Sequence, residues 1–288
     1  MRRIETDELE DYLWNAAKVL RGHMGAAEYK QYIFPMLFWK RISDTWDEEK
    51  ERSIHDYGQD FEENHKIKLP EDAHWTIVRD SSRDLGVKIL NAMRAIENAN
   101  HPLLAGVFGD AQWTNKDKLP DETLRDLIEH FSTMKLDTVS LPEDELGTGY
   151  EYLIRKFADD SGHTAAEYYT NRTVVHLMTE LLKPRPNETI YDPTCGSGGM
   201  LISSLHHIKK SGKEFRNIGL FGQEINLLTS AIARMNLFLH GVQDFDIQLG
   251  DTLDDPKFIE NGQIRKFDVV LANPPYSISR WDRAKWVS

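Results

Sequence analysis

An abrupt strand ending near residue 272 constrains the fold more than any other feature of the sequence. Four consecutive apolar residues, Val269–Ala272, are typical of a strand buried on both faces. They are followed by Asn273, Pro274, Pro275 and Tyr276. Neither proline can donate to a ladder and each restricts the residue before it, so the strand must stop here. The pattern predicts that Asn273 and Tyr276 project from the carboxyl edge of a sheet, where open α/β folds bind ligands.

The chemistry of this ending suits a flat ring that carries an amine. The Asn273 amide can both donate and accept hydrogen bonds, and Tyr276 offers an aromatic face. An ordinary proline-rich strand exit would contain the same residues, so features elsewhere in the sequence are needed to decide between the two interpretations.

The first part of the sequence has a largely helical pattern. Apolar residues recur at the helical period, and polar connections separate the amphipathic segments. Helices are predicted within residues 9–20, 26–51, 85–99, 123–134 and 146–158. We expect a polar connection at 51–72 and a short extended piece at 75–78. The polar stretch Asp159–Gly162 is the expected boundary between a helical domain, 1–160, and a second domain, 161–288.

Helices and strands alternate after this boundary. The predicted helices are 171–182, 200–210 and 227–239, and the predicted strands are 189–192, 218–225, 246–250 and 267–272. Such alternation predicts an α/β fold with a mainly parallel, doubly wound, Rossmann-like sheet.

Four polar residues fall at or beside the carboxyl ends of these four strands. They are Asp192, Glu224, Asp251 and Asn273. Because the carboxyl ends of parallel strands form one crevice in open α/β sheets, we expect these side chains to converge. The shared position of these four residues supports a binding site more strongly than any single motif does.

A glycine-rich loop follows Asp192. It contains Thr194, Cys195, Gly196, Ser197, Gly198 and Gly199. The loop lacks the Lys of a phosphate-binding P-loop, which makes a triphosphate site a poor fit. Glu224 ends the next strand, where an acid usually accepts hydrogen bonds from ribose hydroxyls, so a nucleoside such as S-adenosylmethionine fits better. A tight strand-to-helix turn is the alternative for the loop alone, and we interpret Cys195 as a packing residue.

Four segments together resemble a known family. They are 149–154 (Gly-Tyr-Glu-Tyr-Leu-Ile), 166–170 (Ala-Glu-Tyr-Tyr-Thr), 192–199 (Asp-Pro-Thr-Cys-Gly-Ser-Gly-Gly) and 273–276 (Asn-Pro-Pro-Tyr). This combination is similar to the modification (M) subunit of type I restriction-modification systems, which are adenine-N6 DNA methyltransferases. The resemblance is tight over about 146–276 and looser over the helical 1–145.

The resemblance implies roles for named residues. The cofactor's methionine part would be held by Glu167, Tyr168, Tyr169, Thr170, Asp192, Thr194, Gly196, Ser197, Gly198 and Gly199. Glu224 would hold its ribose and Asp251 its adenine. Asn273, Pro274, Pro275 and Tyr276 would hold a flipped-out adenine for direct methyl transfer, with no metal required.

Charge and composition bear on partners. The net charge is −12, and residues 161–288 contain equal numbers of basic and acidic side chains, so residues 1–160 carry the whole excess. An acidic chain is a poor DNA binder on its own, and a more basic partner is expected to deliver DNA. The resemblance implies a separate specificity subunit and a restriction subunit.

A single cysteine and the lack of any apolar run of about 20 residues favour a cytoplasmic protein without a membrane segment.

Three alternatives stay open from the sequence. The first two are methylation of a protein glutamine and of cytosine N4, which use similar motifs. The third is a non-catalytic module that binds cofactor or partners. The chain ends twelve residues after Tyr276, and since sheets of this family normally continue, we expect an incomplete sheet.

Overall fold

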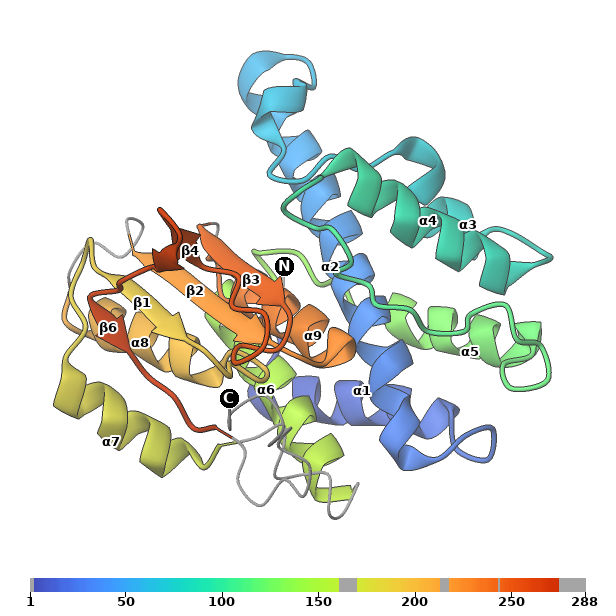
Figure 1. Ribbon diagram of the computed structural model, residues 1–288. Helices are drawn as coiled ribbons and strands as arrows, with labels where there is room; N and C mark the ends of the chain where they lie inside the picture. Colours follow the sequence, from blue (N-terminus) through green and yellow to red (C-terminus); the bar gives the residue numbers. More distant parts are fainter. Residues whose placement is uncertain (1–2, 161–169, 213–217, 243, 275–288) are drawn as a thin grey trace.

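The computed structural model describes residues 3–160, 170–212, 218–242 and 244–274. Its first part is helical, as predicted, and its second part is a sheet flanked by helices (Figure 1). The helices of the first part are α1 (Thr6–Val19), α2 (Ala26–Tyr57), α3 (Trp75–Arg79), α4 (Leu85–Ala99), α5 (Asp121–Ser132) and α6 (Glu143–Asp160). Two 3-10 turns lie at Glu62–Asn64 and Glu71–Ala73.

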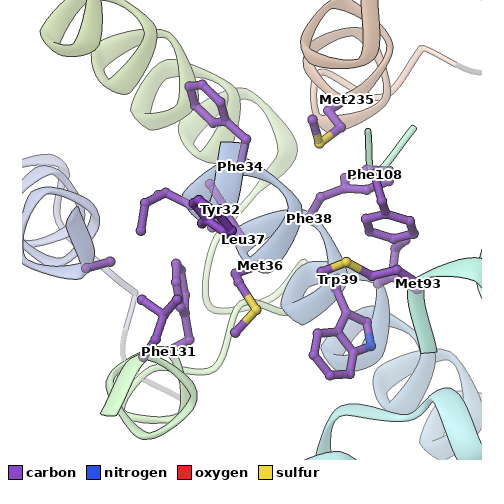
Figure 2. Packing of buried hydrophobic residues seen from close by; sticks show 14 of the residues in the cluster. Tyr32, Phe34, Met36, Leu37, Phe38, Trp39, Met93, Phe108, Phe131 and Met235 are labelled. Carbon is purple, nitrogen blue, oxygen red and sulfur yellow. The ribbon is translucent and has the colours of Figure 1, made fainter. Parts of the chain in front are cut away.

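The long helix α2 forms the centre of the helical part. Its residues 32–39 are nearly all apolar and are buried around the whole circumference of the helix, because other helices pack on every side (Figure 2). Phe34 and Phe38 contact Tyr150 of α6 and Phe108 respectively, with ring centroids 4.6 and 5.7 Å apart. The aromatic residues of this segment therefore form core rather than an exposed surface.

Two expectations for the helical part are wrong. The extended piece expected at 75–78 is the helix α3, which begins where the His74 ring accepts a hydrogen bond from the Thr76 backbone N–H at 3.3 Å. The polar connection expected from residue 51 begins later, because α2 continues to Tyr57 and ends at Gly58 in the left-handed conformation. Capping explains both differences. A single residue such as His74 or Gly58 sets where a helix begins or ends, and the spacing of apolar residues does not reveal that position.

The second part contains a parallel sheet, which confirms the predicted α/β class. Its strands pair in the order β3-β2-β1-β6, and each described pair is parallel. The elements are α7 (Arg172–Leu182), β1 (Thr189–Asp192), α8 (Gly199–Lys210), β2 (Gly219–Glu224), α9 (Leu227–Leu239), β3 (Phe245–Leu249) and β6 (Val269–Val270). Helices α8 and α9 are the crossovers, and Asn226 caps α9 as expected, accepting from the Thr229 N–H at 3.0 Å.

The two faces of the sheet differ. Ile190 and Leu220 lie in a core cluster with residues of α8 and α9. The alternate residues Tyr191 and Phe221 point to the other face. There they pack against the rings of Phe258 and Phe267, and the Tyr191 and Phe267 centroids are 4.5 Å apart. The segment after β3 thus covers that face with aromatic side chains.

The last strand differs from its prediction. Only Val269 and Val270 are paired as a strand, and Val270 is 51% exposed, so the predicted burial on both faces is wrong for the described residues. A short hairpin, β4 (Ile259–Glu260) and β5 (Gln263–Ile264), was not predicted. Its turn, Asn261-Gly262, has positive φ at both residues, which is the strongest short hairpin signal a sequence can carry.

The strand order fixes where a ligand can bind. From β1 the chain moves outward to β2 and β3, and then returns to add β6 on the opposite side of β1. The order therefore reverses between β1 and β6, and open α/β sheets have a crevice at such a reversal, outside the carboxyl ends of the strands.

Helix α9 connects the two parts of the structure. Its residues Ala231, Ile232, Met235 and Leu239 belong to the core cluster of the helical part. The boundary predicted at residue 160 stays a prediction.

Candidate functional site

The glycine-rich loop leaves β1 in a conformation that requires glycine. Gly196 has φ +54° and Gly198 has φ +82°, both in the left-handed region. Among the residues that the structure describes, no atom lies within 4 Å of the position that a Cβ on Gly196 would occupy. The backbone at Gly196 is therefore open to close approach by a ligand, whereas a Cβ on Gly198 would lie 3.6 Å from the Ala233 Cβ of α9.

Backbone hydrogen bonds fasten the loop to the end of β2. The Cys195 N–H donates to the Gln223 carbonyl at 3.0 Å, and the Gly198 N–H donates to the Cys195 carbonyl at 2.8 Å. The Cys195 side chain is buried against Gly222, and burial raises the pKa of its thiol well above the usual range. A buried, protonated thiol is a packing group, in agreement with its interpretation from the sequence.

Two carboxyl groups lie at the start of the loop. Asp192 is 2% exposed, and its Oδ1 accepts from the Thr194 N–H at 3.0 Å. Glu224 accepts from the Gly196 N–H at 3.1 Å through Oε2 and from the Asn226 N–H at 2.8 Å through Oε1. Burial, with a smaller contribution from the charge of Glu224, raises the pKa of Asp192 to about 7. The ends of β1 and β2 thus bring two acids together, as the strand-end pattern predicts.

Asp251 lies on the exposed side of the same edge. It comes two residues after β3 ends, and its Oδ1 accepts from the Leu253 N–H at 2.9 Å, which forms a local turn. The neighbouring Thr252 hydroxyl donates to the Pro193 carbonyl, and the Gly250 N–H donates to the Glu224 carbonyl at 3.0 Å. These contacts bring the segment around Asp251 beside the glycine-rich loop.

Asn273 and Thr170 meet across 103 residues of sequence. The Asn273 Nδ2 donates to the Thr170 Oγ1 at 3.1 Å. The Leu271 N–H donates to the Tyr191 carbonyl at 3.0 Å, which holds this strand exit beside β1. Thr170 is half-buried, whereas Asn273 and Pro274 are exposed. Five further predicted site residues, Glu167, Tyr168, Tyr169, Pro275 and Tyr276, lie outside the described residues.

Three contributors to the site were not predicted. Gln223 is 0% exposed, and its amide accepts from the Lys257 N–H at 3.0 Å and donates to the Asp255 carbonyl at 2.9 Å, which fixes the segment after Asp251. A polar residue inside a buried strand normally has such partners, so Gln223 carried a usable signal. Gly222 leaves room for Cys195, and Asn236 of α9 donates to the Ser197 carbonyl at 2.9 Å. The sequence alone does not single out Gly222 or Asn236, because their contacts exist only in the folded chain.

Family models match both parts of the chain. The model described as HsdM N-terminal domain matches residues 9–131. The model described as N-6 DNA Methylase matches residues 142–288, which is just over half of the chain. The chain belongs to the N-6 DNA methylase family. The match includes the glycine-rich loop and the Asn-Pro-Pro-Tyr segment, so the family resemblance stated from the sequence is confirmed.

Similar proteins are longer than this chain. The MjaIX methylase subunit, a type I restriction enzyme subunit from Methanocaldococcus jannaschii, is 26% identical over 96% of this chain and 52% of its own length. The MpnII methylase subunit from Mycoplasma pneumoniae is 26% identical over 96% of this chain and 59% of its own length. The crystal structure of a type I restriction-modification system methyltransferase subunit from Streptococcus thermophilus superimposes with a TM-score of 0.77 at 28% identity, covering 94% of this chain and 64% of that chain.

The chain spans about half the length of the curated relatives it matches. Within the part that the structure describes, no helix is long and apolar enough to cross a membrane. The same residues contain no group of three or more His, Cys, Asp or Glu side chains that could hold a metal ion.

Proposed function

We propose that this chain is the cofactor-binding and catalytic part of an M subunit of a type I restriction-modification system, which methylates adenine N6 in DNA. One observation carries the proposal: at the point where the strand order reverses, Asn273 lies beside Thr170. Family membership favours this function over protein-glutamine and cytosine-N4 methylation.

The glycine-rich loop fits S-adenosylmethionine as a ligand. Gly196 offers open backbone, and the buried Thr194 Oγ1 has no hydrogen-bond partner in the described structure, so it can serve a ligand. Glu224 brings negative charge to the loop, and the pKa of about 7 means that Asp192 adds a second charge only as the pH rises through that value, which favours a cation. When bound, S-adenosylmethionine supplies an electrophilic methyl group on a positively charged sulfur. In this proposal Glu224 binds its ribose and Asp251 its adenine.

The contact with Thr170 orients Asn273 for its role. Because Nδ2 donates to the Thr170 hydroxyl, the amide is held in one orientation, with Oδ1 as its accepting end. Oδ1 and the Pro274 carbonyl can then accept the two amino hydrogens of a flipped-out adenine, which aligns the nitrogen lone pair for transfer. The rigid proline fixes the direction of that carbonyl.

The partners in this proposal rest on the family resemblance, and the charge of the chain supports the need for one of them. Its net charge of −12 disfavours independent DNA binding, so a specificity subunit brings DNA to the site, and a restriction subunit joins the same assembly. The cytoplasm is the proposed compartment.

Replacement of Asn273 tests the proposal. In the complex with its specificity partner, Asn273→Ala should lower the single-turnover rate of DNA methylation by roughly 100-fold or more, because one oriented acceptor at the reacting nitrogen is lost. Calorimetry should find S-adenosylmethionine affinity unchanged, since the glycine-rich loop is intact. Asn91→Ala, on the exposed side of α4, is the matched control and should leave both quantities unchanged.

The outcomes separate the proposal from its alternative. A wild-type rate in Asn273→Ala would show that the segment is only a strand exit. Cofactor binding without methylation by the wild-type complex would instead support the non-catalytic module.

A further inference from the structure

Helix α9 lies between the sheet and the helical part. One side of α9 carries Ala233 and Leu237, which belong to the core cluster under the sheet. The other side carries Ile232 and Met235, which belong to the core cluster of the helical part. Figure 2 shows Met235 on its helix facing the region of Phe38 and Phe108. Any shift of α9 would therefore change the packing of both core clusters.

Polar contacts reinforce this position of α9. The Tyr150 hydroxyl of α6 donates to the Ile232 carbonyl at 3.3 Å. The Arg234 guanidinium donates to the Ala105 carbonyl of the helical part, and the Phe238 and Phe38 rings pack edge to face with centroids 5.2 Å apart. Helix α9 is therefore fixed from the helical side independently of its contacts with the sheet.

Asn236 connects this helix to the glycine-rich loop. It is 0% exposed, and its Nδ2 donates to the Ser197 carbonyl at 2.9 Å, across 39 residues of sequence. The next residue of the loop, Gly198, packs on Ala233 one turn earlier along α9. Asn236 thus holds the loop at the peptide between its two left-handed glycines.

The Asn236 amide is not optimised for stability. Its Oδ1 is buried and has no hydrogen-bond partner in the described part of the chain. A buried acceptor without a partner opposes folding. A requirement other than stability is needed to explain an amide here, and the contact with Ser197 supplies one.

We infer that Asn236 is a positioning residue for the cofactor. By holding the Ser197 carbonyl, it fixes the course of residues 196–198, so that the backbone that faces the ligand is formed before binding. Because α9 is packed in the helical core, this hydrogen bond also makes the loop geometry depend on how the helical part packs on α9. The inference rests on the proposed function, since it takes S-adenosylmethionine as the ligand of the loop.

Binding and stability are measured on the same variants of the whole chain. Asn236→Leu and Asn236→Ala both remove the amide and differ in volume. Each should bind S-adenosylmethionine about tenfold more weakly by calorimetry, the size expected for one hydrogen bond that acts only on the bound geometry. Both variants also leave the Ser197 carbonyl without this donor, so some loss of stability is expected, and the loss of affinity should exceed that of a control variant with a similar fall in the thermal unfolding midpoint, a difference that a purely structural residue would not show.

Hydrogen exchange supplies a readout without ligand. In both variants the backbone N–H groups of residues 195–199 should exchange faster than in wild type, while those of β2 stay unchanged. Ser204→Ala is the matched control, because it removes a buried hydroxyl that donates to the Met200 carbonyl at 3.0 Å within α8 and leaves the contact between Asn236 and Ser197 in place. It should alter neither binding nor exchange of the loop.

Three results would overturn the inference. The first is wild-type affinity in a folded Asn236→Leu or Asn236→Ala variant, even with faster exchange. The second is an equal loss of affinity in Ser204→Ala, which would assign the effect to general loosening. The third is a wild-type chain that binds no S-adenosylmethionine, which refutes the proposed function itself.

Discussion

Replacing Asp192 with Asn should change how stability depends on pH. The Asp192 carboxyl is buried, and its pKa is raised from the ordinary value of 3.8 to about 7. The folded chain therefore holds a proton that the unfolded chain has already lost. The contribution of this group to the unfolding free energy is fully present below about pH 4 and is lost as the pH rises through about 7. Asn is neutral throughout and keeps the carbonyl that accepts from the Thr194 N–H.

The size of the effect follows from the two pKa values. A difference of about three pH units corresponds to about 4 kcal/mol of unfolding free energy over the full range. Between about pH 5 and about pH 8 the unfolding free energy of the wild-type chain should fall by about 2–3 kcal/mol. The rest of the decrease occurs at lower pH. The stability of the Asp192→Asn variant relative to wild type should rise by the same amount.

Urea unfolding at several pH values measures this difference. His240 also titrates, since burial lowers its pKa from 6.5 to about 4, and its contribution is lost as the pH falls. That contribution has the opposite sign but is common to both chains, so it cancels in the comparison. Asp117→Asn, the same replacement at an exposed position in a turn, is the control. A flat difference between Asp192→Asn and wild type from pH 5 to pH 8 would refute the reasoning.

Two further changes probe the ends of the strands. Glu224→Ala should weaken S-adenosylmethionine binding by about 1–3 kcal/mol in calorimetry, because charged hydrogen bonds are lost, and unchanged affinity would exclude a ribose role. Gly222→Ala should lower the unfolding free energy by about 1–3 kcal/mol, because its Cβ would lie 2.6 Å from the Ile247 Cδ1 and 2.9 Å from the Cys195 Sγ. Adding Cys195→Ala to Gly222→Ala should recover part of the loss in urea unfolding, and no recovery would contradict this packing.

The sequence predicted the elements that local patterns determine. Strands β1 and β2 end at Asp192 and Glu224 as expected, and α4 has the predicted bounds. These features depend on hydrophobic period and on residues that stop strands, both of which are visible in a short window. The hairpin at Asn261-Gly262, although not predicted, has an equally local signal in its Asn-Gly dipeptide.

Other features depend on tertiary contacts that no local pattern encodes. The hydrogen bond between Thr170 and Asn273 joins segments that neighbour each other only once β6 pairs with β1. The contact of Asn236 with Ser197 depends on the angle at which α9 crosses the loop. The exposure of Val270 reflects its place on an edge strand in the described sheet, whereas an apolar run alone resembles a strand covered on both sides.

Buried polar groups without a full set of partners occur in both parts of the described chain, for example Thr45 and Glu151 in the helical part, and two such groups lie beside the glycine-rich loop. In the helical part, the buried Lys40 and Asp44 pair with each other, and Asp44 also accepts from the Leu136 N–H at 2.6 Å. Beside the glycine-rich loop, Asp192 is a buried acid next to a second acid, and Asn236 has an oxygen without a partner in the described residues. Both groups oppose the stability of the free chain. A bound ligand can compensate such groups, and here both act on the same few residues of one loop.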